Sequence, residues 1–286
     1  MSALDWAPLA GVDFARLHDA RVHAHYAAQW LARVARAYLP SKPDDSHTNL
    51  GWDDAFGGLE THKLQGARIG LKFAPLALAI LEGKDSTPSR AFALDGRKEA
   101  DARAWLGEEL GHLGLDARAL DAALPYKIPV HKLSAGAPYA AATIADALRD
   151  LAAWYSNANR SIGRVRDAMI ERKFDVSPAR CWPHHFDFAA LIAVDSGKGT
   201  VESARSVGVG LSPGDENIGE PYFYVTPWPY PPPAKLPHLP EIGGWYAKNF
   251  TAAVVPAHRI LAAKGRQTET EKFLEAAVEA SLKALG

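Results

Sequence analysis

A histidine pair followed by a carboxylate occurs in the stretch CWPHHFDFAA, which begins at Cys181. If this stretch forms a strand, His185 and Asp187 lie on one face of it, because side chains alternate between the two faces. His184 would then share the opposite face with Phe186. An imidazole and a carboxylate on one face supply two of the three ligands of a two-histidine, one-carboxylate metal site. The pair therefore predicts a divalent metal site or acid–base chemistry, and a structural hydrogen bond is the alternative.

A metal site at His185 and Asp187 needs a second histidine from elsewhere in the chain. The downstream candidates are His238, in a proline-rich segment, and His258, within a helical pattern. Neither context predicts that the imidazole converges on Asp187. Cys181 precedes the pair by three and four residues, a spacing that does not bring a thiol beside an imidazole in a strand. We therefore expect no thiol chemistry there.

A second cluster of chemically active residues lies in LSPGDENIGEPYFYVTPWP. Asp215, Glu216 and Glu220 crowd three carboxylates into one turn, and such a group can perform acid–base chemistry or bind a hard cation. Tyr222 and Tyr224 share one face of the strand that follows. A solvated acidic loop, followed by tyrosines that only pack, is the alternative.

The two clusters would form one site if their strands were neighbours in a sheet. Four side chains could then line a single cleft, namely His185, Asp187, Glu220 and Tyr222, with Glu216 in the turn beside them. These five are the candidate catalytic residues, and the first two are the candidate metal ligands.

A glycine-rich stretch in the first half, SHTNLGWDDAFGGLETH, offers a third set of polar groups beside an indole. His47, Asn49, Trp52 and His62 could form a pocket for a small ligand, and Tyr224 joins them as a candidate ligand-binding residue. The alternative is a hairpin in which these groups serve only the turn.

Composition and charge exclude several classes of function. The 286 residues are 48% hydrophobic and 23% charged, which is the range of globular proteins. A net charge of -1 provides no field that attracts nucleic acid or an anionic membrane, so we predict neither as a partner.

A single cysteine cannot form a disulfide within the chain, which favours a reducing, cytoplasmic location. No apolar run has the length of a membrane helix. The phosphate-binding pattern GxxxxGK[ST] and the zinc-protease pattern HExxH are absent from the sequence.

The spacing of apolar residues predicts the elements that must position these groups. Helical spacing predicts helices over residues 13–38, 98–113, 116–124, 138–174, 244–263 and 268–285. Short apolar runs between turn residues predict strands over 67–73, 76–82, 184–194, 203–211 and 221–225. Short links between the last three strands favour antiparallel pairing. Seven prolines from Pro227 to Pro240 predict an extended segment on the surface.

These elements predict an α+β fold in which antiparallel sheets pack against long helices. We expect a single globular domain over 1–286 or, as the alternative, two intimate halves, 1–130 and 131–286. The order helix, strands, helix occurs once in each half, so a pseudo-duplicated arrangement is a further hypothesis. Unrelated strand orders in the two halves would contradict it.

Several motifs together resemble an uncharacterised bacterial family, DUF5996. They are HTNLGWDD, THKL with the following GARIGLKF, CWPHHFDFA and GLSPGDENIGEPYFYVTPWP. The resemblance spans roughly residues 46–230, and the last two motifs are its most specific part. It carries no assigned activity, so it implies no catalytic residue.

Two classes of function remain. The first is a soluble small-molecule enzyme whose polar cleft uses His185, Asp187 and the acidic turn 215–220, with a divalent metal as the candidate cofactor. The second is a non-catalytic ligand-binding or protein-interaction protein that uses tryptophan and tyrosine walls and the proline-rich segment. Convergence of His185 Nε2 and the carboxylates within about 5 Å around a cavity would favour the enzyme.

Overall fold

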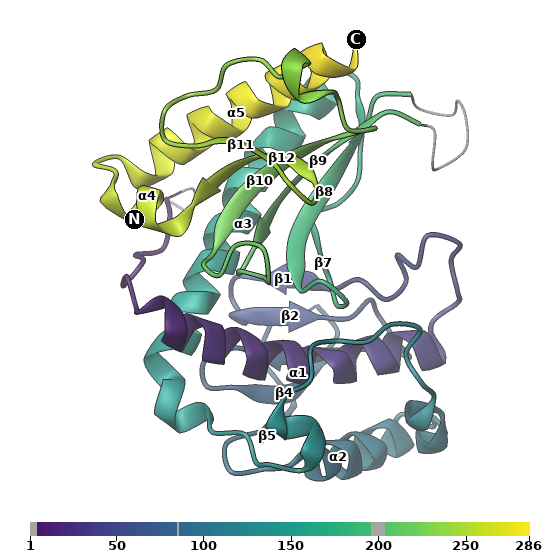
Figure 1. Cartoon of the computed structure of the whole chain (residues 1–286). Coiled ribbons are helices and arrows are strands. Elements are labelled where there is room, and N and C mark those ends of the chain that lie inside the picture. Colours follow the sequence, from purple (N-terminus) through teal and green to yellow (C-terminus); the bar gives the residue numbers. More distant parts are fainter. Residues whose placement is uncertain (1–4, 85, 196–203) are drawn as a thin grey trace. The chain divides into compact units, whose positions relative to one another are not determined.

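The computed structural model describes residues 5–84, 86–195 and 204–286, which form two compact units (Figure 1). The N-terminal unit comprises Val12–Ala152 and Cys181–Phe186. The C-terminal unit comprises Met1–Gly11, Ala153–Arg180 and Asp187–Gly286. Residue 130, where the sequence suggests a division, lies inside the N-terminal unit.

The predicted α+β class is confirmed by the elements and their pairing. The helices are α1 (Phe14–Tyr38), α2 (Glu99–His112), α3 (Ala145–Glu171), α4 (Ala257–Ala262) and α5 (Arg266–Leu285). The 3-10 turns are η1 (Ala117–Asp121), η2 (Lys132–Ala135), η3 (Ala141–Ile144) and η4 (Pro233–Lys235). The strands of the N-terminal unit are β1 (Gly51–Asp53), β2 (Gly58–Glu60), β3 (Ala67–Lys72), β4 (Ala77–Glu82) and β5 (Arg90–Ala93). The later strands are β6 (Asp175–Val176), β7 (Arg180–Trp182), β8 (Asp187–Ala193), β9 (Ser206–Ser212), β10 (Tyr222–Trp228), β11 (Gly244–Ala247) and β12 (Thr251–Pro256). Residue 203, where the predicted strand 203–211 begins, lies outside the described residues.

The N-terminal sheet is an antiparallel meander in the order β1-β2-β3-β4-β5. Helix α1 packs against β3 and begins at the capping residue Asp13, whose carboxylate accepts from the Ala15 N–H at 2.9 Å. Gly70 in β3 lies against the Phe56 ring, which a Cβ at this position would approach to 2.9 Å. A side chain would not fit there, so glycine lets the buried Phe56 cover the strand.

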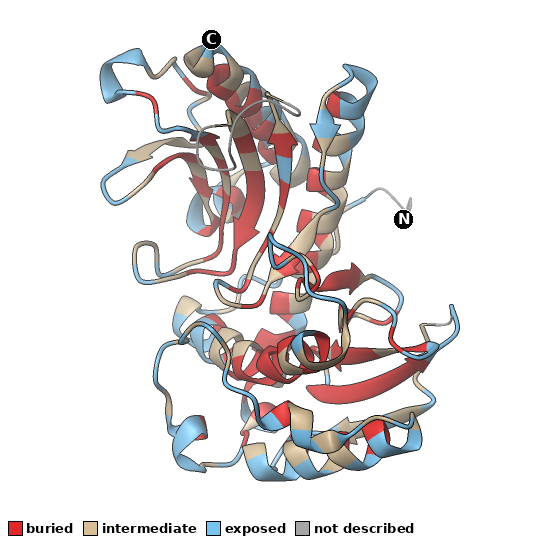
Figure 2. Cartoon of the chain, turned by 90° about the vertical axis from the view of Figure 1, so that its right-hand side faces the viewer, coloured by how far each residue is buried: buried red, intermediate tan, exposed pale blue. Residues whose placement is uncertain are grey.

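The C-terminal sheet has the order β11-β12-β10-β9-β8-β6, in which neighbouring strands are antiparallel, and β7 also pairs with β8. Alternate residues such as Phe188, Val209 and Phe223 are fully buried, and their face of the sheet packs against helices. Trp154 of α3 lies against Phe223 with ring centroids 6.5 Å apart, and α5 contacts β9, β10 and β12 (Figure 1). Figure 2 shows buried residues concentrated along the strands. The alternate side chains lie on the other face, where Tyr222 and Ser212 are also buried and Trp228 is exposed.

The predicted helix over 244–263 is wrong, because most of this stretch forms the hairpin β11–β12 and only α4 is helical. β12 pairs with β10, so that Val255 lies opposite Phe223. Its β-branched residues Thr251, Val254 and Val255 suit a strand in that buried environment. The predicted helix over 116–124 is only the short turn η1. In the stretch 244–263, the pairing of strands therefore outweighs the helical spacing of the apolar residues.

Part of the strand order is shared by the segments that follow the two long helices. Neighbouring strands pair in the order β1-β2-β3-β4 after α1 and β7-β8-β9-β10 after α3, but after α3 the strand β6 comes first and also pairs with β8. Each set opens with a hairpin in which a tryptophan is followed four residues later by a buried phenylalanine, Trp52 with Phe56 and Trp182 with Phe186. The orders differ after the fourth strand, since β5 lies beside β4 whereas β12 lies beside β10. The duplication hypothesis is thus compatible with four strands of each set.

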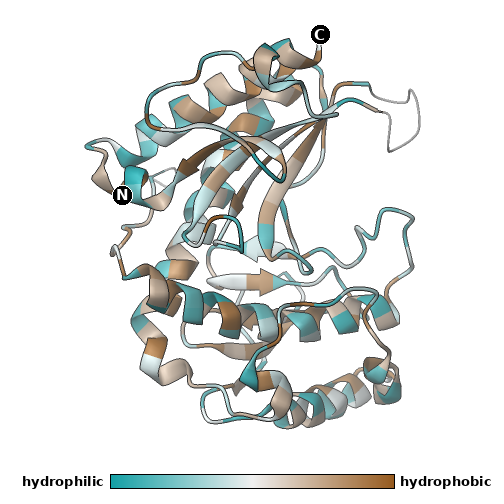
Figure 3. Cartoon of the chain, in the orientation of Figure 1, coloured by the Kyte–Doolittle hydropathy of each residue, from teal (hydrophilic) through white to brown (hydrophobic). Residues whose placement is uncertain are grey.

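Hydrophobic and hydrophilic residues alternate along the helices (Figure 3), as expected when one face packs and the other meets water. In the described part of the chain, no helix has both the length and the apolar composition needed to span a membrane.

Candidate functional site

The histidine pair lies in a turn, because β7 ends at Trp182 and β8 begins at Asp187. The ring centroids of His184 and His185 are only 4.2 Å apart, and Phe186 has a positive φ of 59°. The predicted alternation of the two histidines between opposite strand faces is therefore wrong. A turn does not keep the two-residue period of a strand, so strand geometry cannot place His185 with Asp187.

A histidine of α1 anchors this turn. The Pro183 carbonyl accepts hydrogen bonds from His25 Nε2 at 2.8 Å and from Gln29 Nε2 at 2.9 Å. The His25 ring also stacks on Phe186, with centroids 4.9 Å apart. Burial lowers the pKa of His25 to about 4, so the imidazole is neutral at physiological pH and carries its proton on Nε2. The sequence signal for this anchor is a pair of polar residues, four apart, within an apolar helix face.

The His184 ring lies beside the rings of Tyr126, Trp182 and His185, and the charge of Asp45 also acts on it. Burial lowers the pKa of His184 to about 4, and the neighbouring His185 adds to the shift. The His184 ring lies 5.6 Å from that of Tyr126, whose hydroxyl donates to Gln29 Oε1 at 3.0 Å. His185 itself is exposed. The turn is thus a packed structural feature with one exposed imidazole.

Asp187 meets a tyrosine from a strand that is not its neighbour. β9 lies between β8 and β10, so the two motif strands are not neighbours and the condition for a single cleft, adjacent strands, is not met. The Tyr224 hydroxyl nevertheless donates to Asp187 Oδ2 at 2.5 Å, with the ring crossing over Gly210 of β9. A Cβ at Gly210 would lie 2.6 Å from the Tyr224 hydroxyl and 2.8 Å from the Ala189 Cβ. Glycine is therefore required for the contact between Tyr224 and Asp187.

A second phenol binds the carboxylate of the acidic turn. The Tyr222 hydroxyl donates to Asp215 Oδ2 at 2.5 Å, and Ser212 Oγ lies 3.4 Å from the same oxygen. Asp215 Oδ1 accepts from the backbone N–H groups of Asn217 at 2.7 Å and Ile218 at 3.0 Å. All of these bonds stay within one unit. Asp215 therefore shapes the turn and holds Tyr222.

We name Asp187, Asp215, Tyr222 and Tyr224 the carboxylate–phenol cluster. Burial is the largest cause that raises the pKa of both phenols, and the carboxylates raise it further. The two tyrosines consequently remain protonated at all pH values near neutrality. They can donate hydrogen bonds, whereas chemistry that needs a tyrosinate base is not available to them.

The glutamates of the acidic turn do not join this cluster. Glu220 accepts from the His258 N–H and contacts His258 Nδ1, both at 2.7 Å. It therefore caps the first turn of α4, where a carboxylate is favoured by the helix dipole. Glu216 is exposed. Among the residues that the structure describes, no three or more His, Cys, Asp or Glu side chains are grouped so that they could hold a metal ion.

The candidate residues of the first half serve their own loop. Asn49 Oδ1 lies 2.9 Å from His62 Nε2, and Trp52 Nε1 donates to Asp54 Oδ1 at 2.9 Å. His47 Nδ1 accepts from the Lys42 N–H at 3.2 Å. His47, Asn49 and Trp52 are buried. These bonds support the structural alternative, a hairpin whose polar groups hold the loop in shape.

Ser212 is a residue of the site that the sequence predictions omitted. It lies in GLSPG, residues 210–214, which fits the GxSxG pattern of hydrolase nucleophiles. That pattern requires a strand, a sharp turn and a helix, whereas the element after this turn is the strand β10. Ser212 Oγ accepts from the Gly214 N–H at 3.2 Å and is buried. The serine therefore stabilises the turn, and Cys181, which is fully buried, is equally inaccessible.

We expect Tyr224→Phe to lower the free energy of unfolding by about 1–3 kcal/mol, because the partly buried Asp187 carboxylate loses a donor. Urea unfolding followed by circular dichroism measures the change. Tyr230→Phe is the matched control, since Tyr230 is 47% exposed, and should change stability by less than about 0.5 kcal/mol. Equal stabilities of the two variants would contradict a role for the hydrogen bond.

Comparisons with protein-family models, curated proteins and solved structures find no match to this chain.

Proposed function

We propose that the protein binds a small organic cation at Asp187, on the face of the C-terminal sheet that carries Asp187, Tyr222, Tyr224 and Trp228. We name this the tyrosine face. The hydrogen bond from Tyr224 to Asp187 carries the proposal, because it holds a carboxylate beside two phenol rings. A carboxylate attracts an ammonium group, and an aromatic face adds about 0.5–2 kcal/mol of cation–π attraction.

The composition of the tyrosine face supports a cation as the ligand. The ring centroids of Tyr222 and Tyr224 lie 6.1 Å apart, and Trp228 on the same strand is 41% exposed. Both phenols are neutral, so the formal charges of the cluster are those of Asp187 and Asp215. An anionic ligand would be repelled by them.

An acid–base enzyme at the same place is the second candidate function. It is favoured by the closeness of two carboxylates, since Asp187 and Asp215 each raise the pKa of both Tyr222 and Tyr224. In this enzyme Asp187 would exchange the proton, and Tyr224 would be a positioning residue that fixes the orientation of the carboxylate. A divalent ion bound at Asp187 would belong to this candidate.

We also propose a relationship to the DUF5996 family, on the motifs that resemble it, and a cytoplasmic location, which the single cysteine supports. Neither the family relationship nor the cytoplasmic location assigns a function to any residue of the chain.

Titration calorimetry and thermal unfolding with putrescine and choline test the binding proposal. We expect a rise in Tm of about 2–3 °C at ten times the Kd, because the ligand binds only the folded state. Asp187→Asn should weaken binding about tenfold or more, since it removes a charge-assisted contact. Asp175→Asn, at an exposed carboxylate of β6, is the control and should bind like the unaltered protein. Absence of binding for both cations would contradict the proposal.

The enzyme is tested separately with a cell metabolite extract, with and without Mg²⁺ or Zn²⁺. Mass spectrometry should detect compounds that disappear with the unaltered protein and persist with Asp187→Asn. If the Asp187→Asn variant still converts these compounds, Asp187 is not the residue that exchanges the proton.

A further inference from the structure

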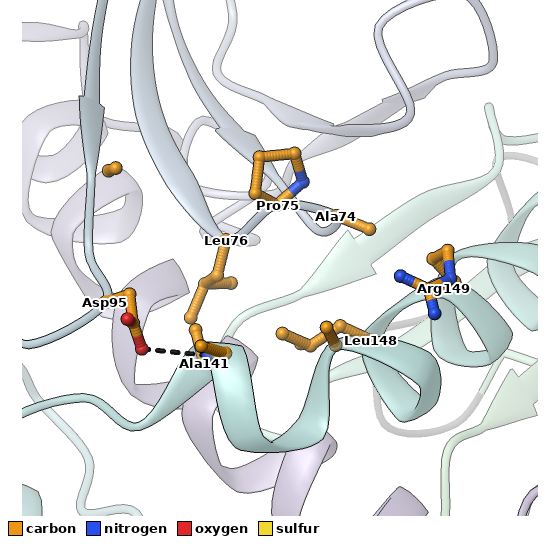
Figure 4. A pocket seen from close by; sticks show the side chains of 10 residues that line it. Ala74, Pro75, Leu76, Asp95, Ala141, Leu148 and Arg149 are labelled. Carbon is orange, nitrogen blue, oxygen red and sulfur yellow. Dashed lines mark hydrogen bonds between the residues drawn. The ribbon is translucent and has the colours of Figure 1, made fainter.

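A cavity of about 280 Å³ lies in the N-terminal unit, between the β3–β4 turn and the start of α3 (Figure 4). Its walls are formed by Ala74, Pro75, Leu76, Ala93, Asp95, Ala141, Ala142, Ala145, Leu148 and Arg149. All of them belong to one unit, and none belongs to the carboxylate–phenol cluster. The cavity is therefore independent of the function proposed above.

The walls of the cavity are almost entirely apolar. Pro75, Leu76 and Leu148 supply the larger surfaces, and alanines leave the space that larger side chains would fill. The volume equals that of about nine water molecules in the liquid, which suits a ligand of roughly ten non-hydrogen atoms. Water is a poor occupant of such an apolar space, so an apolar group can replace it favourably.

Two charged residues stand at different ends of the cavity (Figure 4). Asp95 Oδ1 accepts from the Ala142 N–H at 2.8 Å, so this carboxylate caps the start of η3. Arg149 extends from α3 beside Leu148 and is exposed. Within the described residues, no hydrogen bond or ion pair engages the Arg149 guanidinium.

We propose that this cavity binds a small monocarboxylate whose apolar body fills it and whose carboxylate pairs with Arg149. A guanidinium presents two parallel N–H donors that match the two oxygens of a carboxylate. The capping role of Asp95 gives this carboxylate a partner in the chain, whereas no group among the described residues occupies a donor of Arg149, so its guanidinium can pair with a ligand.

Titration calorimetry with octanoate, octanol and octylamine tests the proposal on the full-length protein. The three probes share one chain and differ only in the head group. We expect octanoate to bind at least about tenfold more tightly than octanol, because a charge-assisted hydrogen bond is lost with the alcohol. Octylamine should bind most weakly, since its charge repels Arg149. Equal affinities for octanoate and octanol, or no binding of octanoate, would overturn the proposal.

Variants of the same protein locate the site. Arg149→Gln should weaken octanoate binding about tenfold to a hundredfold and leave octanol unchanged, whereas Arg149→Lys should retain part of the preference. Arg118→Gln is the matched control, because Arg118 is an exposed arginine that pairs with Asp116 away from the cavity. Ala145→Phe, which places a ring at the cavity wall, should abolish binding of both probes while circular dichroism verifies folding. Unchanged octanoate affinity in Arg149→Gln would assign the binding to another place and refute the inference.

Discussion

Replacing Phe186 with alanine is expected to lower the free energy of unfolding by about 3–5 kcal/mol, the largest change that we predict for one residue of the histidine motif. The Phe186 ring is buried, stacks on His25 at 4.9 Å and lies 6.1 Å from the Phe73 ring. Its loss leaves a cavity beneath the turn and removes the support of the His25 imidazole. Urea unfolding followed by circular dichroism measures the change.

Two further variants separate packing from backbone strain at this position. Phe186 has a left-handed φ of 59°, which costs a residue with a side chain about 1–2 kcal/mol. Phe186→Gly loses the same ring and also relieves this strain, so we expect it to be no less stable than Phe186→Ala. Leu191→Ala truncates an apolar residue of β8 that is 49% exposed and should cost less than about 0.5 kcal/mol. A loss below about 1 kcal/mol for Phe186→Ala would contradict the packing role.

Acid is expected to destabilise the protein through His25, by about 3 kcal/mol between pH 7 and pH 4. The folded pKa of about 4 lies below the value of about 6.5 in the unfolded chain, so below pH 6.5 the unfolded state binds more protons. Stability therefore falls as the pH falls from about 6.5 to about 4 and gains nothing above that range. The lowered pKa of His184 acts in the same direction. Unfolding in urea at several pH values measures the slope.

Two variants on α1 identify the source of the pH dependence. His25→Gln removes the titrating group and should flatten the curve by about 3 kcal/mol between pH 7 and pH 4. Gln29→Leu removes the other donor to the Pro183 carbonyl but no titrating group, so it should lower stability equally at both pH values. If both variants retain the full slope, the buried imidazole of His25 is not its cause.

The spacing of apolar residues along the chain was sufficient to predict many of the helices and strands. Helices α1, α2, α3 and α5 and strands β3, β4, β8, β9 and β10 follow from apolar spacing, because a face that packs must recur with the period of its element. The helix predicted over 244–263 failed because pairing of β12 with β10 decided its conformation. That contact joins residues far apart in the sequence.

The candidate site was predicted only in part, for the same reason. Tyr222 and Tyr224 were expected on one face of a strand, and Asp187 was singled out as a carboxylate of interest. Their meeting across Gly210 depends on the strand order, which spacing along one chain does not contain. His25 was missed because its partner, Pro183, lies on a turn distant in sequence.

By itself, the sequence determined the α+β class, the periodic elements and the residue types available for chemistry. Those depend on local spacing and composition. Only the tertiary structure decided that CWPHHFDFAA is a packed turn, in which His184 contacts His185 and Phe186 holds His25, and that Asp187 belongs with Tyr224. Strand order, turn conformation and burial follow from contacts between distant segments, and these contacts set the hydrogen-bond partner of Asp187 as well as the lowered pKa of His25 and the raised pKa of Tyr224.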